Sequence, residues 1–383
     1  MQARLSEERQ MMVEALSGTI RRVSPQDRVQ ALDNAKIFDA DLHRALGEIG
    51  ILGLGVPEEE GGSGGGATEQ MLALETLGNL ATSMAVFTVV QFMATRLLRE
   101  YGSPDQKARW LAPLCRGEIR CSFSLTEAGG GTDVLSAMRT RARKTGEGWT
   151  LSGEKMWISG ATQADLVIAV ARTADHRSRG ITLFLVPTNA KGFSATAIDT
   201  VAINGYDTCA VSFDQVSLPG DAVLGHVDEG FSHVVATLNG ERLNCAGVAT
   251  GIARGAWQAA LEYSRQRQAF GKSIGQFQAL QHRLVQAGIA IEAGWLLALR
   301  AAEEDEAGRP ADIAASMAKY AASQAALQAT HVGMEIMGGA GFDLRSPMQR
   351  WFRDARLYVF APHTNDMSLN YLGERWLGLP RSF

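Results

Sequence analysis

Apolar residues recur at three- and four-residue spacing from residue 1 to about residue 120, for example in FDADLHRALGEIGILGLG and MLALETLGNLATSMAVF. This period places them along one face of a helix and predicts an α-helical N-terminal region. A helix is expected to begin in SPDQKARWLAPL, where Ser103 is the N-cap, Pro104 lies in the first turn and Gln106 completes a capping box.

The pattern changes between residues 121 and 226. Short β-branched and aromatic runs such as GWTLSG, DLVIAVAR and ITLFLVPT are separated there by Gly, Pro, Asn and Asp. Such runs are typical of antiparallel strands in a small barrel or sandwich. No long helical stretch separates the runs, so a doubly wound parallel sheet is disfavoured.

The helical period returns from residue 227 to residue 383, in four segments joined by short loops. The expected helices cover residues 230–267, 276–303, 310–338 and 345–376. This arrangement predicts an antiparallel four-helix bundle. The fold class is therefore multidomain α+β, with an N-terminal α-helical domain, a central antiparallel β-barrel or sandwich and a C-terminal four-helix bundle. Their expected boundaries are residues 1–120, 121–226 and 227–383.

Composition argues against several classes of function. The 383 residues are 46% hydrophobic and 20% charged, and their formal net charge is −4 without any basic block. Binding of nucleic acid or of a membrane surface is therefore not expected. The cysteines lack CxxC spacing and local histidine partners, so we expect no metal site and no disulfide framework. Reduced thiols fit an intracellular protein, and we expect it to be cytoplasmic.

No targeting or integral membrane segment is expected. The first residues, MQARLSEERQMMVEAL, contain three glutamates and lack an apolar core, unlike a secretory signal. The most apolar helical stretch, residues 285–302, is interrupted by Gln286, Glu292 and Arg300. It is short for a membrane span and charged, so we interpret it as a buried helix of the bundle.

Two glycine-rich stretches differ in what they indicate. Residues 62–67, GSGGGA, follow three glutamates rather than a strand, which favours a structural turn over a nucleotide loop. Residues 121–134, CSFSLTEAGGGTDV, lie where the helical region meets the β region, a typical place for a pocket. Their consecutive glycines let a ligand approach the backbone, although a plain interdomain loop explains them equally well.

Four further motifs follow this segment: GEKMWISGA at 153–161, YSRQRQAFGKSIGQFQ within 241–285, EIMGGAGF at 335–342 and RWFRDAR at 350–356. Together the five motifs resemble those of the acyl-CoA dehydrogenase family, approximately TEPxxGSD, KxWITN, YxxxRxQFGxxIxxFQ, QxxGGxG and RDAR. The order and the spacing agree across essentially the whole chain. The resemblance implies FAD as cofactor, an acyl-CoA substrate and a homotetramer.

The resemblance also implies roles for residues of the first two motifs. Phe123, Leu125 and Thr126 are expected to line the flavin, and Trp157 and Ser159 to contact its ring. Ser159 stands where the family usually has threonine and keeps the hydroxyl. Thr132 stands where the family has serine, and it is expected to reach both the FAD phosphates and the pantetheine arm of the substrate.

The C-terminal motifs imply contacts with the rest of FAD. The residues matching the QFG motif contact the FAD of a neighbouring subunit in this family; they are Arg267, Phe270 and Gln278. Gly338 and Gly339 match the glycine pair near the adenosine half, and Glu335 replaces a common glutamine there. Thr364 retains the threonine of a later motif and is expected near FAD.

The chemistry requires a carboxylate base in an apolar pocket, because burial raises its pKa towards neutrality. Many family members carry this glutamate in a YEGT motif, but this chain has Pro362 at that position. A minority branch, including isovaleryl- and long-chain-type enzymes, places it before an arginine on the first bundle helix. Glu241 and Arg242 match that pattern, so Glu241 is the expected base and Arg242 orients it or the substrate. A solvent-facing helix glutamate is the alternative interpretation.

Pro362 also lacks the N–H with which this position helps to hold the thioester carbonyl in the family. Either His363 or a shift of the loop is expected to supply another donor, or the enolate is stabilised more by the ribityl hydroxyl of FAD. His363 is also a secondary candidate for the pocket. By position, Leu238 and Asn239 are expected to border the acyl group.

The leading hypothesis is dehydrogenation of an acyl-CoA to its trans-2-enoyl form, with electrons passed to an electron-transfer flavoprotein. One alternative is a related flavoenzyme that reduces an enoyl thioester or uses a carrier-protein thioester. Another is a non-catalytic partner subunit that completes a neighbour's FAD site, motivated by Pro362 and Glu335. The intact Thr126, Trp157, Ser159 and Arg267 argue against that last hypothesis.

Overall fold

The N-terminal region is helical, as the apolar period predicts. The computed structural model describes residues 5–176 and 179–381. Its first helices are α1 (Glu7–Val23), α2 (Gln26–Ala35), α3 (Ala40–Glu48), α4 (Ala67–Leu80), α5 (Thr82–Tyr101), α6 (Pro104–Gln106) and α7 (Ala112–Cys115). Ser103 Oγ accepts a hydrogen bond from the Gln106 N–H at 3.2 Å, and the Gln106 side chain accepts one from the Ser103 N–H at 3.0 Å. The predicted capping box is thus confirmed.

The middle region forms a sheet with the order β6-β7-β3-β2-β4-β5-β8, and β1 pairs with β4 off this path. The strands are β1 (Cys121–Ser124), β2 (Arg141–Thr145), β3 (Gly148–Ser159), β4 (Leu166–Arg172), β5 (Ile181–Pro187), β6 (Phe193–Ile198), β7 (Thr208–Leu218) and β8 (Val223–Leu224); α8 (Val134–Ala137) precedes β2. The sheet is mixed, because β1 and β2 both pair with β4 in parallel. The expectation of purely antiparallel strands was wrong for these two pairs. Parallel partners need a long connection, which the β2–β3 hairpin supplies between β1 and β4.

Strand β4 contributes side chains to two hydrophobic cores, one on each face of the sheet. Its residues are all buried, and alternate side chains enter two different cores. Leu166, Ile168 and Val170 pack with the helical residues of α5 and α7, whereas Val167 and Ala169 pack inside the β region. The sheet is therefore held against the N-terminal helices on one face.

Three long helices dominate the C-terminal region: α9 (Gly230–Gln266), α10 (Gln278–Glu306) and α11 (Asp312–Met337). The hairpin β9 (Gln268–Ala269) and β10 (Lys272–Ser273) joins the first two. The short helix α12 (Gly339–Phe342) follows α11. The prediction of a fourth long helix over residues 345–376 was wrong, because three short helices replace it: α13 (Pro347–Asp354), α14 (Leu357–Phe360) and α15 (Asn365–Arg375). Pro347 is the first residue of α13 and follows the N-cap Ser346. Pro362 cannot extend α14, because proline has no N–H to donate to the helix.

Glycines let α4 approach α9 closely. A Cβ atom on Gly251 would lie 2.0 Å from the carbonyl oxygen of Glu75, and one on Gly78 would lie 2.5 Å from that of Val248. Either side chain would push the two helices apart. The close packing fixes the N-terminal helices on α9, the helix that also carries Glu241.

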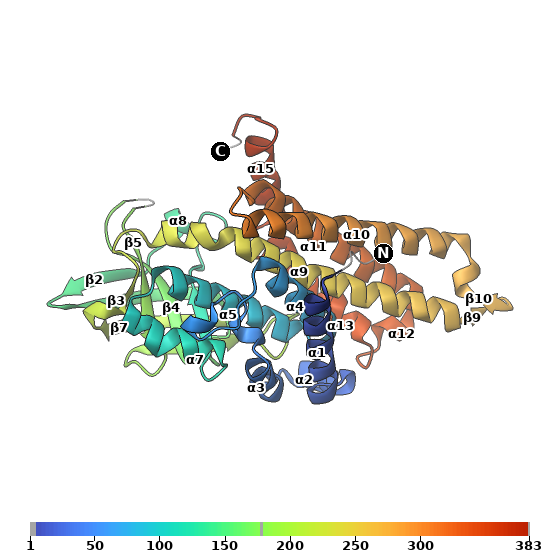
Figure 1. The fold of residues 1–383 in the computed structure, drawn as a ribbon, viewed down its shortest axis with the longest axis horizontal. Coiled ribbons are helices and arrows are strands. Elements are labelled where there is room, and N and C mark those ends of the chain that lie inside the picture. The colour runs from blue at the N-terminus through green and yellow to red at the C-terminus, as the bar shows by residue number, and fades with distance from the viewer. Residues whose placement is uncertain (1–4, 177–178, 382–383) are drawn as a thin grey trace.

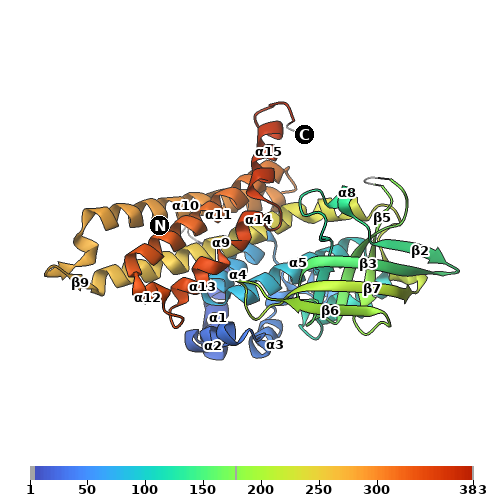
Figure 2. The same cartoon turned by 180° about the vertical axis from the view of Figure 1, so that it is seen from behind.

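The sheet lies at one end of the elongated molecule and the β9–β10 hairpin at the other, with α9 running between them (Figures 1 and 2). Helix α15 projects from the side of the bundle. By length and composition alone α10 could cross a membrane, and 39% of its most apolar window is buried against its neighbours. The absence of a membrane segment therefore stays a prediction.

The four cysteines are free and buried. Within residues 5–176 and 179–381, no group of three or more His, Cys, Asp or Glu side chains is arranged to hold a metal ion.

Candidate active site

Strands β1 and β3 bring the first two sequence motifs side by side. Ser122 Oγ donates a hydrogen bond to the Ser159 carbonyl at 2.7 Å, and the Met156 N–H donates to the Thr126 carbonyl at 2.9 Å. Thr126 and Ser159 are both half-buried. The structure therefore places Thr126 and Ser159, which both carry hydroxyls, on neighbouring segments.

Trp157 lies at an irregularity in the pairing of β3 with β7, between Lys155 and Ile158. Its backbone has a φ of 65°, which is unusual for a bulky residue, and its side chain is 58% exposed. An exposed indole held in a strained conformation is a common feature of binding sites. The surface around Trp157 is therefore suited to a planar ligand.

A buried ion pair that sequence reasoning missed joins the same two motifs. Lys155 Nζ lies 2.9 Å from Glu127 Oε1, and the two side chains are 0% and 8% exposed. Lys155 also donates to the Leu125 carbonyl at 2.9 Å, and the Glu127 carboxylate accepts from the N–H groups of Arg139 and Thr140. Burial lowers the pKa of Lys155 to about 8, against the opposing effect of Glu127. The pair fixes the loop that contains the glycines and Thr132.

Glu241 lies in the first half of α9 and is half-buried. Burial raises the pKa of its carboxyl from 4.5 to about 7, although Arg242 opposes the shift. Among the described residues its carboxylate has neither a hydrogen bond nor an ion pair. A carboxylate that is buried but unpaired is chemically available, unlike one on a solvated helix face.

Within the described residues, Arg242 makes no hydrogen bond or ion pair with Glu241. Its Nη1 donates to Asn239 Oδ1 at 2.8 Å, and its guanidinium lies 5.3 Å from the centre of the Tyr371 ring. The Tyr371 hydroxyl in turn donates to Asp312 at the start of α11. Burial lowers the pKa of Arg242. Residues of α9, α11 and α15 thus hold the Arg242 guanidinium in place.

Residues 361–364 lie next to this cluster, since His363 interacts electrostatically with Arg242. His363 Nε2 and Ser368 Oγ are 2.9 Å apart, and burial, with Arg242 and Lys319, lowers the pKa of His363 to about 3. The imidazole is therefore neutral near pH 7. Thr364 caps α15, because its Oγ1 accepts from the Met367 N–H at 3.2 Å.

The residues matched to the C-terminal motifs are not brought to this site within one chain. Arg267, Phe270 and Gln278 flank the β9–β10 hairpin at the far end of the bundle, where the Phe270 side chain is 94% exposed (Figure 1). Gly338 and Gly339 lie near that end, where α11 meets α12. The Glu335 carboxylate pairs with Arg283 at 2.7 Å. Any contact of these residues with the site requires a second subunit.

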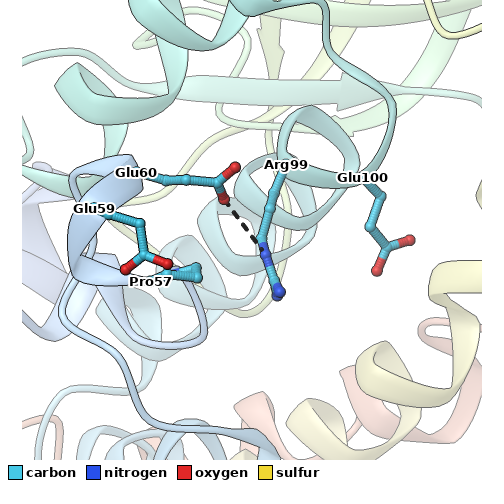
Figure 3. A pocket seen from close by; sticks show the side chains of 5 residues that line it. All are labelled: Pro57, Glu59, Glu60, Arg99 and Glu100. Atoms are coloured by element: carbon cyan, nitrogen blue, oxygen red, sulfur yellow. Dashed lines mark ion pairs between the residues drawn. The ribbon is translucent and has the colours of Figure 1, made fainter.

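A separate surface hollow contains none of the residues that the motifs identify. It lies between a turn after α3 and the end of α5, and Figure 3 shows its lining residues Pro57, Glu59, Glu60, Arg99 and Glu100. Arg99 Nε lies 3.5 Å from Glu60 Oε2. This exposed, charged hollow lacks the apolar lining of a typical small-molecule site.

Comparison with known proteins identifies the family. Residues 6–118, 122–216 and 228–377 match the N-terminal, middle and C-terminal domain models of acyl-CoA dehydrogenase. The chain belongs to the acyl-CoA dehydrogenase family.

Among its relatives is the acyl-CoA dehydrogenase fadE12 of Mycobacterium bovis, 33% identical over 99% of this chain and 98% of that protein. The short/branched chain specific acyl-CoA dehydrogenase of Rattus norvegicus is 34% identical over 90% of this chain and 80% of that protein. The butyryl-CoA dehydrogenase of Megasphaera elsdenii has a similar structure, with a TM-score of 0.93 and 31% identity over 98% of this chain and 100% of that one.

The chain is therefore an oxidoreductase that acts on CH–CH groups and uses FAD. The residues present fit that cofactor. Trp157 offers an exposed aromatic surface, and a Cβ atom on Gly129 or Gly131 would have no atom within 4 Å, so the loop leaves space for a ligand. Thr126, two residues after the end of β1, and Ser159, the last residue of β3, supply hydroxyls.

With Glu241 as the expected base, its raised pKa predicts how turnover depends on pH. A base must be deprotonated to act, so kcat is expected to rise with pH through a midpoint near 7 and to level off above it. The charged or titratable side chains that act on this carboxyl are Arg242 and Cys245. The measurement is kcat at saturating substrate between pH 5.5 and 9. A kcat that is already constant from pH 5.5 upwards, as expected for a glutamate with the ordinary pKa of 4.5, would contradict the assignment.

Proposed function

We propose that the chain dehydrogenates an acyl-CoA thioester to the trans-2-enoyl-CoA, with Glu241 as the base that removes the α-proton. The observation that carries this proposal is the half-buried, unpaired carboxylate whose pKa is raised to about 7. Such a group is largely ionised just above neutral pH and is still basic enough to accept a proton. We propose an electron-transfer flavoprotein as the electron acceptor, as in the family.

The residues around Glu241 position the substrate. Arg242 is bonded to Asn239 and not to the base, so it contributes positive charge near the developing enolate without blocking proton transfer. Leu238 and Asn239 border the acyl group, and Thr132 contacts the pantetheine arm. This division of roles leaves the α-carbon facing the carboxylate.

FAD, when bound, supplies the acceptor for the β-hydride. Trp157 would pack its indole against the flavin ring. Phe123 and Leu125 would add apolar contacts to the flavin, and Thr126 and Ser159 would offer it hydroxyl groups. In a homotetramer the hairpin end of a second subunit would reach the outer part of the cofactor. The residues assigned to that contact are Arg267, Phe270, Gln278, Glu335, Gly338 and Gly339, whereas Thr364 approaches FAD from its own subunit.

The thioester carbonyl needs hydrogen-bond donors, since proton loss places negative charge on its oxygen. Pro362 has no N–H. The backbone N–H groups of His363 and Thr364, the next along the chain, make no hydrogen bond within the described residues. They are therefore available for this role.

Absorbance of the purified protein tests the proposal. The protein is expected to be yellow, and anaerobic addition of acyl-CoA thioesters of different length and branching should bleach the visible flavin band with at least one member of the series. A yellow protein that no acyl-CoA bleaches would contradict the proposed reaction. A colourless protein that cannot take up FAD would instead favour a non-catalytic partner subunit.

A further inference from the structure

Lys319 is a buried lysine without a carboxylate partner. It lies on α11, and its residue is 1% exposed. Its Nζ donates to the His363 carbonyl and to Asn365 Oδ1, both at 2.7 Å, and it makes no ion pair within residues 5–176 and 179–381. Asn365 is itself fixed, because its Nδ2 donates to Ser323 Oγ at 3.0 Å. A buried ammonium is costly, so these two contacts require an explanation beyond packing.

The contacts are made close to the proposed base. Cys245 lies one turn after Glu241 on α9 and interacts electrostatically with both Glu241 and Lys319. His363 interacts in the same way with Arg242 and Lys319. Lys319 therefore holds a segment that lies beside Arg242, the residue next to the proposed base.

The geometry of the peptide group gives this anchor a consequence for catalysis. The His363 carbonyl and the Thr364 N–H belong to one planar peptide group, in which they point in opposite directions when the bond is trans. Lys319 fixes the carbonyl, so the Thr364 N–H is directed away from Lys319. That N–H has no acceptor within the described residues, and residues 361–364 are all only half-buried.

We propose that Lys319 is a positioning residue that holds the His363–Thr364 peptide so that the Thr364 N–H binds the thioester carbonyl, in place of the N–H that Pro362 lacks. This inference rests on the proposed acyl-CoA dehydrogenation. It assigns the donor to a backbone group, and it gives the buried Lys319 a role.

A proline at residue 364 tests the donor directly. Thr364 has a φ of −64°, which proline adopts without strain, so T364P removes the N–H with little change of the backbone. T364A is the matched control, because both variants lose the side-chain cap of α15 but only T364A keeps the N–H. We expect kcat of T364P to be about 10²-fold below that of T364A, the usual effect of losing one oxyanion donor. Equal kcat values in the two variants would overturn the inference.

Lys319→Met provides a second test that does not depend on proline at residue 364. We expect kcat to fall roughly tenfold or more because the peptide loses its anchor, with a smaller change in KM and with FAD still bound. The midpoint of the pH profile should stay near that of the wild type. A shifted midpoint with an unchanged plateau would mean that Lys319 acts through its charge on Glu241, Arg242 or Cys245, and would overturn the positioning role.

Lys107→Met is the control for K319M, since Lys107 pairs with Glu60 away from these residues. Its kcat is expected to match the wild type. If wild-type protein is not bleached by any acyl-CoA, the proposed function itself fails. If the wild type is bleached and K319M and T364P both turn over normally, only the role of Lys319 and the Thr364 N–H fails.

Discussion

Replacement of Glu241 by glutamine is expected to lower kcat by at least about 10²-fold while FAD stays bound. Glutamine has nearly the same shape as glutamate, but its amide cannot accept the α-proton. The carboxylate makes no hydrogen bond or ion pair in the described part of the chain, so its loss should not disturb the local structure. The measurement is steady-state turnover together with the FAD content of the purified variant.

Glu262→Gln is the matched control for this experiment. Glu262 lies on the same helix, but its side chain is 57% exposed, and at the surface it pairs with Arg265 and accepts a hydrogen bond from the Gln266 side chain. Its turnover should equal that of the wild type. Near-normal turnover in E241Q would remove Glu241 from the role of base.

E241Q should also be more stable than the wild type at alkaline pH. The pKa of Glu241 is raised in the folded state from 4.5 to about 7, so the folded state is relatively favoured below pH 4.5 and loses this advantage as pH rises through 7. Glutamine stays neutral at every pH. At pH 8 its free energy of unfolding should therefore exceed that of the wild type by up to about 3 kcal/mol, with no difference near pH 4.

Replacement of Lys155 by methionine is expected to lower the free energy of unfolding by about 3–5 kcal/mol, because it leaves Glu127 buried without its counter-charge. It also removes the donor to the Leu125 carbonyl, so the loop with the flavin-facing residues loses its anchor. We expect the purified variant to lose most of its FAD. Urea unfolding and the ratio of flavin to protein absorbance measure the two effects.

Lys107→Met serves as the control here as well. Its ion pair with Glu60 is about one-third exposed on each side, with side chains 30% and 29% accessible. Such pairs contribute about 1 kcal/mol or less to stability. A K155M variant that unfolds at the same urea concentration as K107M and keeps its FAD would contradict the structural role of the buried pair.

The sequence predicted the succession of helical, β and helical regions because helix and strand periods are local properties. It did not predict the parallel pairing of β1 with β4, since that pairing joins Cys121 to Leu166 across an intervening hairpin. The fourth helix was also predicted wrongly. The apolar period continues through Pro362, whereas the chain turns there.

The motifs predicted the hydroxyl and aromatic residues in and near β1 and β3 and the glutamate of α9, because family patterns mark residue types at fixed spacing; their roles stay predictions. The buried ion pair of Glu127 and Lys155 was not predicted, because it joins residues that are 28 positions apart in the sequence. The contact of Lys319 with His363 was not predicted for the same reason, since the two residues are 44 positions apart. A signal for it was present: a single lysine in the alanine-rich stretch AASMAKYAAS lies where the period predicts a buried face.

Exchange of the α-hydrogen with heavy water tests the central claim most directly. A thioester with sulfur in place of its β-carbon can lose the α-proton but cannot give up a β-hydride, so exchange isolates the step assigned to Glu241. Mass spectrometry of such an acyl-CoA should show rapid deuterium incorporation with the wild type and at least about 10²-fold slower incorporation with E241Q. Incorporation at the wild-type rate in E241Q would show that another group removes the proton.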